Sequence, residues 1–206
     1  MQDISSLENA HKDEDIYVVG GGKSLDYYPP IFFKNKTVLA VNQASRIVPS
    51  TYVIRKENSK AGDVPIIASK HVAGRIDGAM NKADYIFEHG QNDCSTIDTA
   101  GCHPHGDKII VSWSTITSAI HLAAFMGART IFLVGHDCAT IDGEQTASGY
   151  YDGVERFTQE QDYSLWLSVI APQTMFLRDY LLKEYLCPLI SLSPFIGLTH
   201  EGHKIG

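Results

Sequence analysis

The sequence predicts an α/β domain of Rossmann-like type, in which a largely parallel sheet carries helices on both faces. Short apolar runs, several of which end at glycine or asparagine, alternate with longer segments that have helical periodicity. Runs that are apolar at every position are typical of parallel strands, because these strands are buried on both faces. Alternating strands and helices of this kind pack in layers around a sheet.

The expected strands are short and rich in valine and isoleucine. They are residues 16–19, 37–41, 51–54, 64–68, 85–87, 130–134 and 189–192, with residues 108–111 as a further short strand or extended segment. Pro65 places the fourth run at an edge of the sheet or at the start of a strand, since proline cannot donate to the hydrogen-bond ladder.

The clearest helix covers residues 115–126. Its apolar positions recur at the spacing of one helical face, Ser114 suits the N-cap, and Gly127 suits the position after the last turn. Two further helices are predicted over residues 159–170 and 172–185, because Pro172 is compatible with the first turn of a new helix.

The length and charge of the chain limit its possible domain organisation and its possible partners. The 206 residues are expected to form an N-terminal arm over residues 1–15 and a single nucleotide-binding domain over residues 16–206. The formal net charge of −7 argues against a nucleic-acid partner, which needs clustered cations. No apolar run approaches the ~20 residues of a membrane span, and the N-terminal residues form no apolar signal core. We therefore expect a cytoplasmic protein with four free thiols, and a homo-oligomer is compatible with the sequence.

A glycine-rich segment directly follows the first expected strand. It consists of Gly20, Gly21, Gly22, Lys23 and Ser24. Glycines allow backbone N–H groups to approach an anion closely, so this segment predicts a phosphate-binding loop. Tyr17 and Leu25 stand where the P-loop and dinucleotide patterns require glycine, so neither pattern is complete. The alternative interpretation is a tight turn after a strand.

Other polar residues follow strands or begin the clearest helix. Asn42 follows the second strand, and its amide can bind a nucleoside or simply form a turn. His136 and Asp137 follow residues 130–134 and Gly135. His136 is a candidate acid or base, and Asp137 is a candidate ligand of a divalent cation or of a ribose hydroxyl, or a cap of the following loop. The hydroxyl groups at the helix start predict either an anion site or ordinary capping, and they belong to Ser114, Thr115, Thr117 and Ser118.

A weaker metal hypothesis rests on four soft ligands in one expected loop. These are Cys94, Cys102, His103 and His105. The interval between the two cysteines is wider than the spacing that zinc sites use, so the sequence leaves metal binding here open.

Four blocks of the sequence together resemble one family. They are residues 18–25, 41–44, 114–123 and 126–137. In their order they resemble the 6-hydroxymethylpterin diphosphokinase MptE-like superfamily, and they are similar to the bacterial sialyltransferases that use CMP-sialic acid. The resemblance runs from Ile16 to about Pro194. Sialyltransferases place an arginine before the hydroxyl pair, where this chain has Trp113 and Ser114.

The resemblance implies a nucleotide-dependent transferase acting on a small-molecule acceptor. The glycine segment and the helix start would hold phosphates of ATP or of a CMP-type nucleotide, and Asn42 would contact the nucleoside. Asp137 would bind Mg²⁺, so its replacement by alanine should remove Mg²⁺-dependent binding and spare the fold. The transferred group is a diphosphate or a similar group. A glycosyltransferase with a CMP-sugar donor and His136 as base, or a non-catalytic nucleotide-binding protein, are the alternatives.

Overall fold

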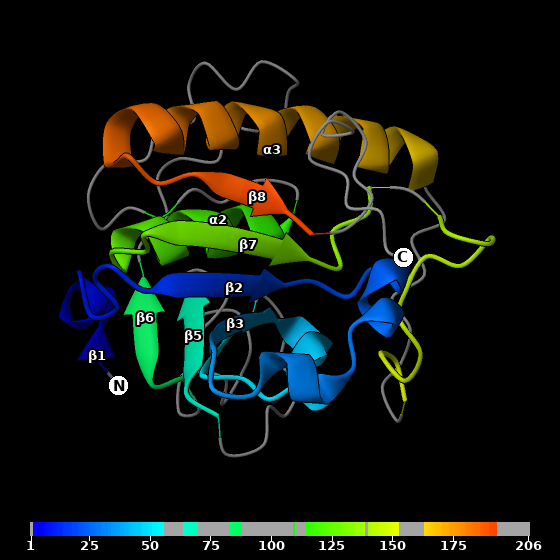
Figure 1. Cartoon of the computed structure of the whole chain (residues 1–206), viewed down its shortest axis with the longest axis horizontal. Coiled ribbons are helices and arrows are strands. Elements are labelled where there is room, and N and C mark those ends of the chain that lie inside the picture. The colour runs from blue at the N-terminus through cyan, green and yellow to red at the C-terminus, as the bar shows by residue number, and fades with distance from the viewer. Residues whose placement is uncertain are drawn as a thin grey trace.

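The computed structural model describes residues 2–55, 64–69, 83–87, 109, 114–138, 140–152 and 163–192. Eight strands form one sheet in which every pair of neighbouring strands is parallel (Figure 1). The strands are β1 (Gln2–Asp3), β2 (Asp15–Val19), β3 (Thr37–Val41), β4 (Tyr52–Arg55), β5 (Ile66–Ser69), β6 (Tyr85–Phe87), β7 (Thr130–Val134) and β8 (Leu189–Ser191). The expected Rossmann-like α/β architecture is therefore confirmed.

The strand order places a change of direction beside β2. The order across the sheet is β1-β6-β5-β4-β3-β2-β7-β8. The chain thus builds the sheet from β2 to β6 on one side and then returns to add β7 and β8 on the other side of β2. In open parallel sheets, ligands bind outside the carboxyl ends of the strands at such a switch point. Here that point lies between β2 and β7.

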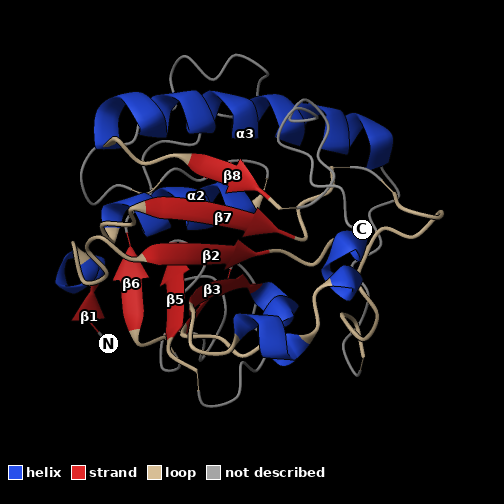
Figure 2. Ribbon diagram, viewed as in Figure 1, coloured by secondary structure: helices blue, strands red, loops and turns tan. Residues whose placement is uncertain are grey.

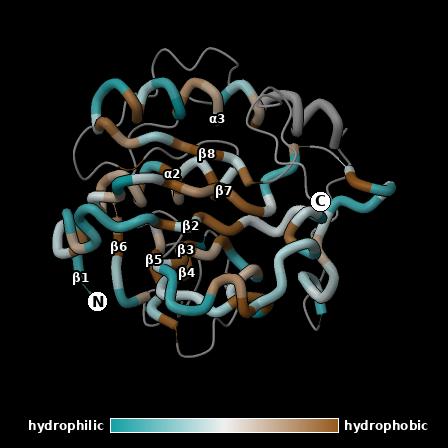
Figure 3. Tube along the Cα trace, viewed as in Figure 1, coloured by the Kyte–Doolittle hydropathy of each residue, from teal (hydrophilic) through white to brown (hydrophobic). Residues whose placement is uncertain are grey.

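Strand side chains alternate between two apolar layers. Ile16 and Val18 of β2 belong to one core cluster, whereas Val19 belongs to the cluster on the opposite face. The same alternation holds in β3, where Leu39 faces the first layer and Val38 the second. Figure 3 shows the hydrophobic character of the central strands. Burial on both faces explains why these runs are apolar at every position.

The described α-helices lie on one side of the sheet, and 3-10 helices cover the other (Figure 2). Helix α2 (Thr115–Phe125) packs on β2, β3, β4 and β7, and helix α3 (Tyr163–Tyr185) packs on α2 and β8. The second face is covered by residues of η2 (Lys23–Tyr27), η3 (Pro30–Phe33) and η4 (Asn42–Arg46). In the described part of the chain, neither α2 nor α3 is both long and apolar enough to cross a membrane.

Helix α3 is continuous through Pro172, so the expectation of two separate helices is wrong. Its buried residues Ile170, Thr174, Leu177 and Leu181 recur every three or four positions on both sides of the proline. Proline inside a helix costs about 3 kcal/mol, since it lacks the N–H group. The uninterrupted buried stripe offsets that cost, and Pro172 itself lies on the exposed side.

Residues 2–14 are part of the domain and not a free arm, which corrects the expectation from the sequence. Strand β1 pairs with β6, and η1 (Ile4–Leu7) places two buried side chains in the core. The N–H groups of Asn9, His11 and Asp13 then donate to the carbonyls of Phe125, Met126 and Gly127, at 3.1, 2.9 and 3.0 Å respectively. These carbonyls end α2 and would otherwise lack partners. The segment therefore completes the carboxyl end of the helix.

Replacing Leu7 by alanine is expected to lower the free energy of unfolding by about 2–4 kcal/mol, the usual cost of truncating a buried leucine. Leu7 is buried in the core cluster that contains α2. Glu8→Ala is the matched control, because Glu8 is exposed. Urea unfolding measures both. Equal stability of the two variants would mean that residues 2–14 behave as a free arm after all.

Two of the four cysteines lie in the described part of the chain. Cys138 and Cys187 are buried free thiols, as expected. Cys94 and Cys102 lie outside the described residues, together with His103 and His105.

Candidate functional site

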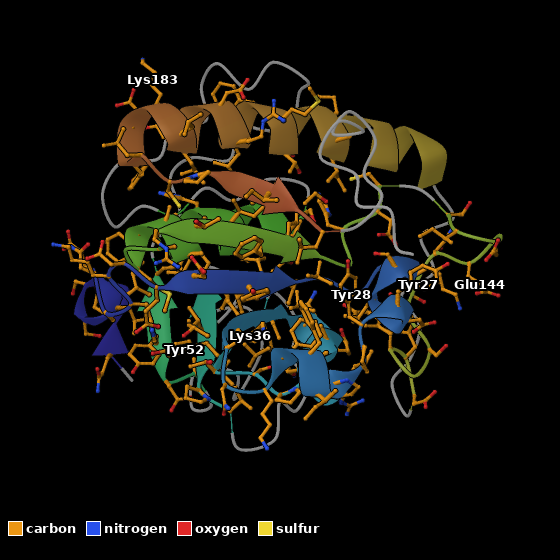
Figure 4. The ribbon with its side chains drawn as sticks, viewed as in Figure 1. Tyr27, Tyr28, Lys36, Tyr52, Glu144 and Lys183 are labelled. Atoms are coloured by element: carbon orange, nitrogen blue, oxygen red, sulfur yellow. The ribbon has the colours of Figure 1, made fainter. Side chains whose placement is uncertain are left out.

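The segments that follow β2, β3 and β7 meet at one edge of the sheet. Val19 of β2 pairs with Ala40 of β3 on one side and with Val134 of β7 on the other. Gly20, Asn42 and Gly135 therefore leave the sheet on the same side, and the expectation of a shared edge is confirmed. Figure 4 shows Tyr27 and Tyr28, which follow the glycine segment, on the side toward which the arrow of β2 points.

Helix α2 begins at this edge. Only a short turn joins its carboxyl end to the start of β7, so the helix runs opposite to the strands. A Cβ atom added at Gly20 would lie 2.8 Å from Cδ1 of Ile116, in the first turn of the helix. The glycine segment and the start of α2, far apart in the sequence, are therefore in contact.

The three glycines are required by close packing within the protein. A Cβ atom at Gly20 would lie 2.4 Å from the carbonyl oxygen of Gly135, and one at Gly21 would lie 2.2 Å from the ring of Tyr150. At Gly22 it would lie 2.7 Å from Oδ2 of Asp137. These distances are shorter than real Cβ contacts, so the segment after β2 fits against the segments after β7 only without side chains.

The N–H groups of this segment are largely used inside the protein. Gly20 donates to the carbonyl of Val134 and Gly22 to that of Gly135, both at 2.8 Å. The expectation that these two N–H groups face a phosphate is therefore wrong. Lys23 forms an ion pair with Asp26 at 3.0 Å, and its ammonium group does not extend freely from the loop.

Asp137 is buried against Ser24, with 4% of its surface exposed. Its Oδ2 accepts a hydrogen bond from the Ser24 backbone N–H at 2.8 Å, and its Oδ1 accepts one from the Ser24 hydroxyl. Burial raises the pKa of Asp137 above its ordinary value, although the two bonds from Ser24 oppose that shift. The carboxylate thus joins the segment after β7 to the glycine segment after β2.

These residues do not fit a magnesium site. Mg²⁺ needs an octahedral shell of oxygen ligands, and the two Asp137 oxygens are directed at Ser24. Within the described residues, no cluster of three or more His, Cys, Asp or Glu side chains could hold a metal ion.

The His136 side chain contacts α3. Its Nε2 lies 2.9 Å from Oγ1 of Thr174, which itself donates to the carbonyl of Ile170 at 3.0 Å. Because that hydroxyl hydrogen is already used, we assign the ring proton to Nε2. The side chain is 8% exposed, and burial lowers the pKa of His136 to about 3. Such an imidazole is neutral and a poor base near neutral pH.

Two hydroxyl groups at the start of α2 bond to the backbone of the first turn. The Ser114 hydroxyl accepts from the Ile116 N–H at 3.3 Å, and the Thr117 hydroxyl donates to the Ser114 carbonyl at 2.7 Å. Thr115, Thr117 and Ser118 are all buried. The first turn contains no acidic residue, so no side-chain charge there neutralises the positive end of the helix dipole.

Asn42 has an unusual conformation and an unsatisfied atom. Its φ of 52° lies in the left-handed region, which asparagine adopts more readily than most residues. Its side-chain carbonyl oxygen Oδ1 is buried and has no hydrogen-bond partner. A buried acceptor without a partner costs about 1–3 kcal/mol, so its presence at a strand end calls for an explanation.

Arg55, the last residue of β4, was missed by the sequence reasoning. It lies one strand beyond Asn42 at the same edge and is only 3% exposed. Its pKa is lowered to about 10, chiefly by burial and also by the positive charge of Arg46, while Tyr150 acts in the opposite direction. A charged residue directly after the apolar residues Val53 and Ile54 was the available signal, since arginine is rarely buried.

Tyr150 and the residues around it pack against the glycine segment. Its ring packs on Gly21, and the following residues hold Arg46, whose Nη1 donates to the carbonyl of Asp152 at 3.0 Å. Asp26 fixes the same loop by accepting two bonds from Ser148, each of 2.8 Å. Residues 146–152 therefore lie against the glycine segment.

The comparisons with known proteins add little to this geometry. No protein-family model matches the sequence, and no curated protein matches it significantly. Among solved structures, the chain is similar to the MAf glycosyltransferase from Magnetospirillum magneticum AMB-1, with a TM-score of 0.47 and 14% sequence identity. The match covers 85% of this chain and 33% of that one, so the present chain spans about a third of that protein's length. A likeness this distant says nothing about substrate.

Proposed function

We propose that this chain is a nucleotide-dependent transferase that binds its donor at the carboxyl edge, beside β2, β3 and β7. The observation that carries the proposal is the buried Oδ1 of Asn42, which has no hydrogen-bond partner. A ligand that donates an N–H or O–H group to this oxygen would recover the energy lost by its burial. Ribose hydroxyls and base amino groups are donors of this kind.

The charge of the surrounding elements favours an anionic ligand. The start of α2 presents the positive end of a helix dipole with no acidic residue in its first turn. Arg55 and Arg46 add two guanidinium groups at the ends of β4 and η4. A nucleotide combines hydroxyl donors with phosphate charge, and so matches both Asn42 and these positive groups.

Two nucleotide substrates fit this description, as the sequence resemblance implies: ATP and a CMP-sugar. Transfer of diphosphate from ATP would release AMP, whereas transfer of a sugar from a CMP-sugar would release CMP. A second candidate function is nucleotide binding without turnover. It is favoured by the burial of His136 and by the engagement of both Asp137 oxygens with Ser24, because neither side chain is then available for proton transfer.

Asn42→Gly is expected to weaken nucleotide binding about tenfold while leaving the ligand-free protein at least as stable. Glycine adopts the left-handed conformation without strain, and its introduction removes the unsatisfied oxygen. One lost hydrogen bond of about 1.4 kcal/mol corresponds to this factor of ten. Asn35→Gly is the matched control, because Asn35 has a φ of 61° but is exposed.

The measurement is a thermal-shift and calorimetric titration with ATP, AMP, CTP and CMP, in the presence of EDTA or Mg²⁺. A nucleotide at 100 times its Kd stabilises a protein by about 2.7 kcal/mol, which is readily detected. Chromatography of reactions with ATP or CMP-sugars then separates the transferase from the binding protein. If none of these nucleotides binds, or if Asn42→Gly binds as well as the wild type, the proposal is overturned.

A further inference from the structure

Arg55 occupies a position where an apolar residue would be the ordinary choice. It ends the buried strand β4, after Val53 and Ile54, and is itself 3% exposed. Moving a guanidinium group out of water is unfavourable, and the lowered pKa of about 10 reflects that cost. A side chain with this cost at a strand end beside a candidate ligand site suggests a role in binding.

A second cation lies within electrostatic range of Arg55. Arg46 belongs to η4, the helical turn that begins at Asn42 and packs against β4, the strand that Arg55 ends. The positive charge of Arg46 lowers the pKa of Arg55. Its Nη1 is bonded to the Asp152 carbonyl, so this guanidinium is fixed on a neutral acceptor. Two like charges repel each other in the ligand-free protein, and an oxyanion near both would turn this repulsion into attraction.

The positions of these groups along the edge separate them from the start of α2. Helix α2 begins beside Gly20, at the end of β2, whereas Arg55 ends β4, two strands further along. Neighbouring strands lie about 4.8 Å apart, so about 10 Å separates the two positions. Asn42, at the end of β3, lies between them.

We propose that Arg55 and Arg46 form a second anion subsite at the β4 end of this edge, which takes a phosphate or carboxylate group of the bound ligand or of the acceptor. The subsite deepens the proposed function and rests on it for the identity of the ligand. A ligand that reaches both this subsite and the start of α2 then carries two acidic groups with hydroxyl donors between them.

The test measures the stabilisation of the full chain by sodium phosphate, by sodium pyrophosphate and by citrate, at constant ionic strength. Constant ionic strength is needed because salt screens exposed charges. Arg55→Gln is expected to weaken binding of these anions about 10- to 100-fold, as for the loss of a hydrogen bond to a charged group. Arg55→Lys keeps the positive charge but not the planar guanidinium group. Its anion affinity should lie between that of the wild type and that of Arg55→Gln.

Arg46→Gln provides a second test, which leaves the buried side chain of Arg55 in place. Arg46 is exposed, so this variant should fold normally and lose about two- to fivefold in anion affinity. Arg129→Gln is the control of equal charge change, because Arg129 lies at the amino end of β7 in an ion pair with Asp15. Its anion affinity should equal that of the wild type.

The outcomes separate this proposal from the proposed function. Equal anion affinity in the wild type, Arg55→Gln and Arg46→Gln would overturn the subsite, even if nucleotides still bind through Asn42. Anion binding that depends on both arginines, in a chain that binds no nucleotide, would support the subsite and reject the nucleotide. Stronger binding of citrate than of phosphate would identify the group as a carboxylate, and the reverse order would identify it as a phosphate.

Discussion

Asp137→Ala is expected to lower the free energy of unfolding by about 2–4 kcal/mol, which differs from the effect expected of a metal ligand. The substitution removes the acceptor of two bonds from Ser24, one from its N–H and one from its hydroxyl. Both donors are buried, and a buried donor without a partner is costly. The contact between the segments after β2 and β7 is then lost.

Urea unfolding of Asp137→Ala and of Asp137→Asn measures this effect. The asparagine variant keeps the shape but turns an amide N–H₂ toward a donor of Ser24, so it should also be destabilised. Asp179→Ala is the control, because the Asp179 side chain is 73% exposed on α3, and its effect should stay within about 0.5 kcal/mol.

A double-mutant cycle with Ser24→Ala isolates the interaction of the carboxylate with the hydroxyl. Residues in direct contact usually show coupling energies of about 0.5–3 kcal/mol. An unchanged stability of Asp137→Ala, with loss of Mg²⁺-dependent nucleotide binding, would instead support the role of metal ligand that the sequence resemblance implies. Zero coupling would show that the hydrogen bond between the Ser24 hydroxyl and Asp137 contributes nothing to stability.

The edge of the sheet could be predicted from the sequence because its signals are local. Each buried strand is a short apolar run, and the residue after the run must leave the sheet. Parallel pairing then brings Gly20, Asn42 and Gly135 together without any knowledge of side-chain contacts. For this reason the fold class and the shared position of the candidate residues were predictable.

The roles of those residues could not be predicted, because they depend on contacts between distant parts of the chain. A glycine after a strand can leave room either for a bound phosphate or for a neighbouring backbone carbonyl. Only the structure shows that the carbonyl of Gly135 lies against Gly20. The N-terminal residues gave no periodic pattern, since their partners are the carbonyls that end α2. For Arg55, the sequence showed only a charged residue at the end of an apolar run. Its burial depends on tertiary packing and could not be predicted.

The stability of the domain is expected to fall as the pH drops from about 6.5 toward 3, because two buried histidines resist protonation. Burial lowers the pKa of His121 and of His136 to about 3 in the folded protein. In the unfolded chain a histidine titrates near 6.5, so between these values the unfolded state binds more protons. Stability therefore rises with pH in this window, by about 1.4 kcal/mol per pH unit for each histidine. The raised pKa of Asp137 acts in the opposite direction, near and above the ordinary value of a carboxyl group.

Urea unfolding at pH 7.5, 6.0, 5.0 and 4.5 tests this dependence in the wild type and in His121→Gln. Glutamine does not titrate. The free energy of unfolding of this variant should therefore fall less steeply on acidification, by about 1.4 kcal/mol per pH unit. Tyr185→Phe is the control, because it removes the hydroxyl that lies 3.3 Å from Nε2 of His121 but keeps the imidazole. Its slope should match that of the wild type, whatever its stability at pH 7.5. Parallel curves for the wild type and His121→Gln would show that His121 is protonated in the folded protein at the same pH as in the unfolded chain.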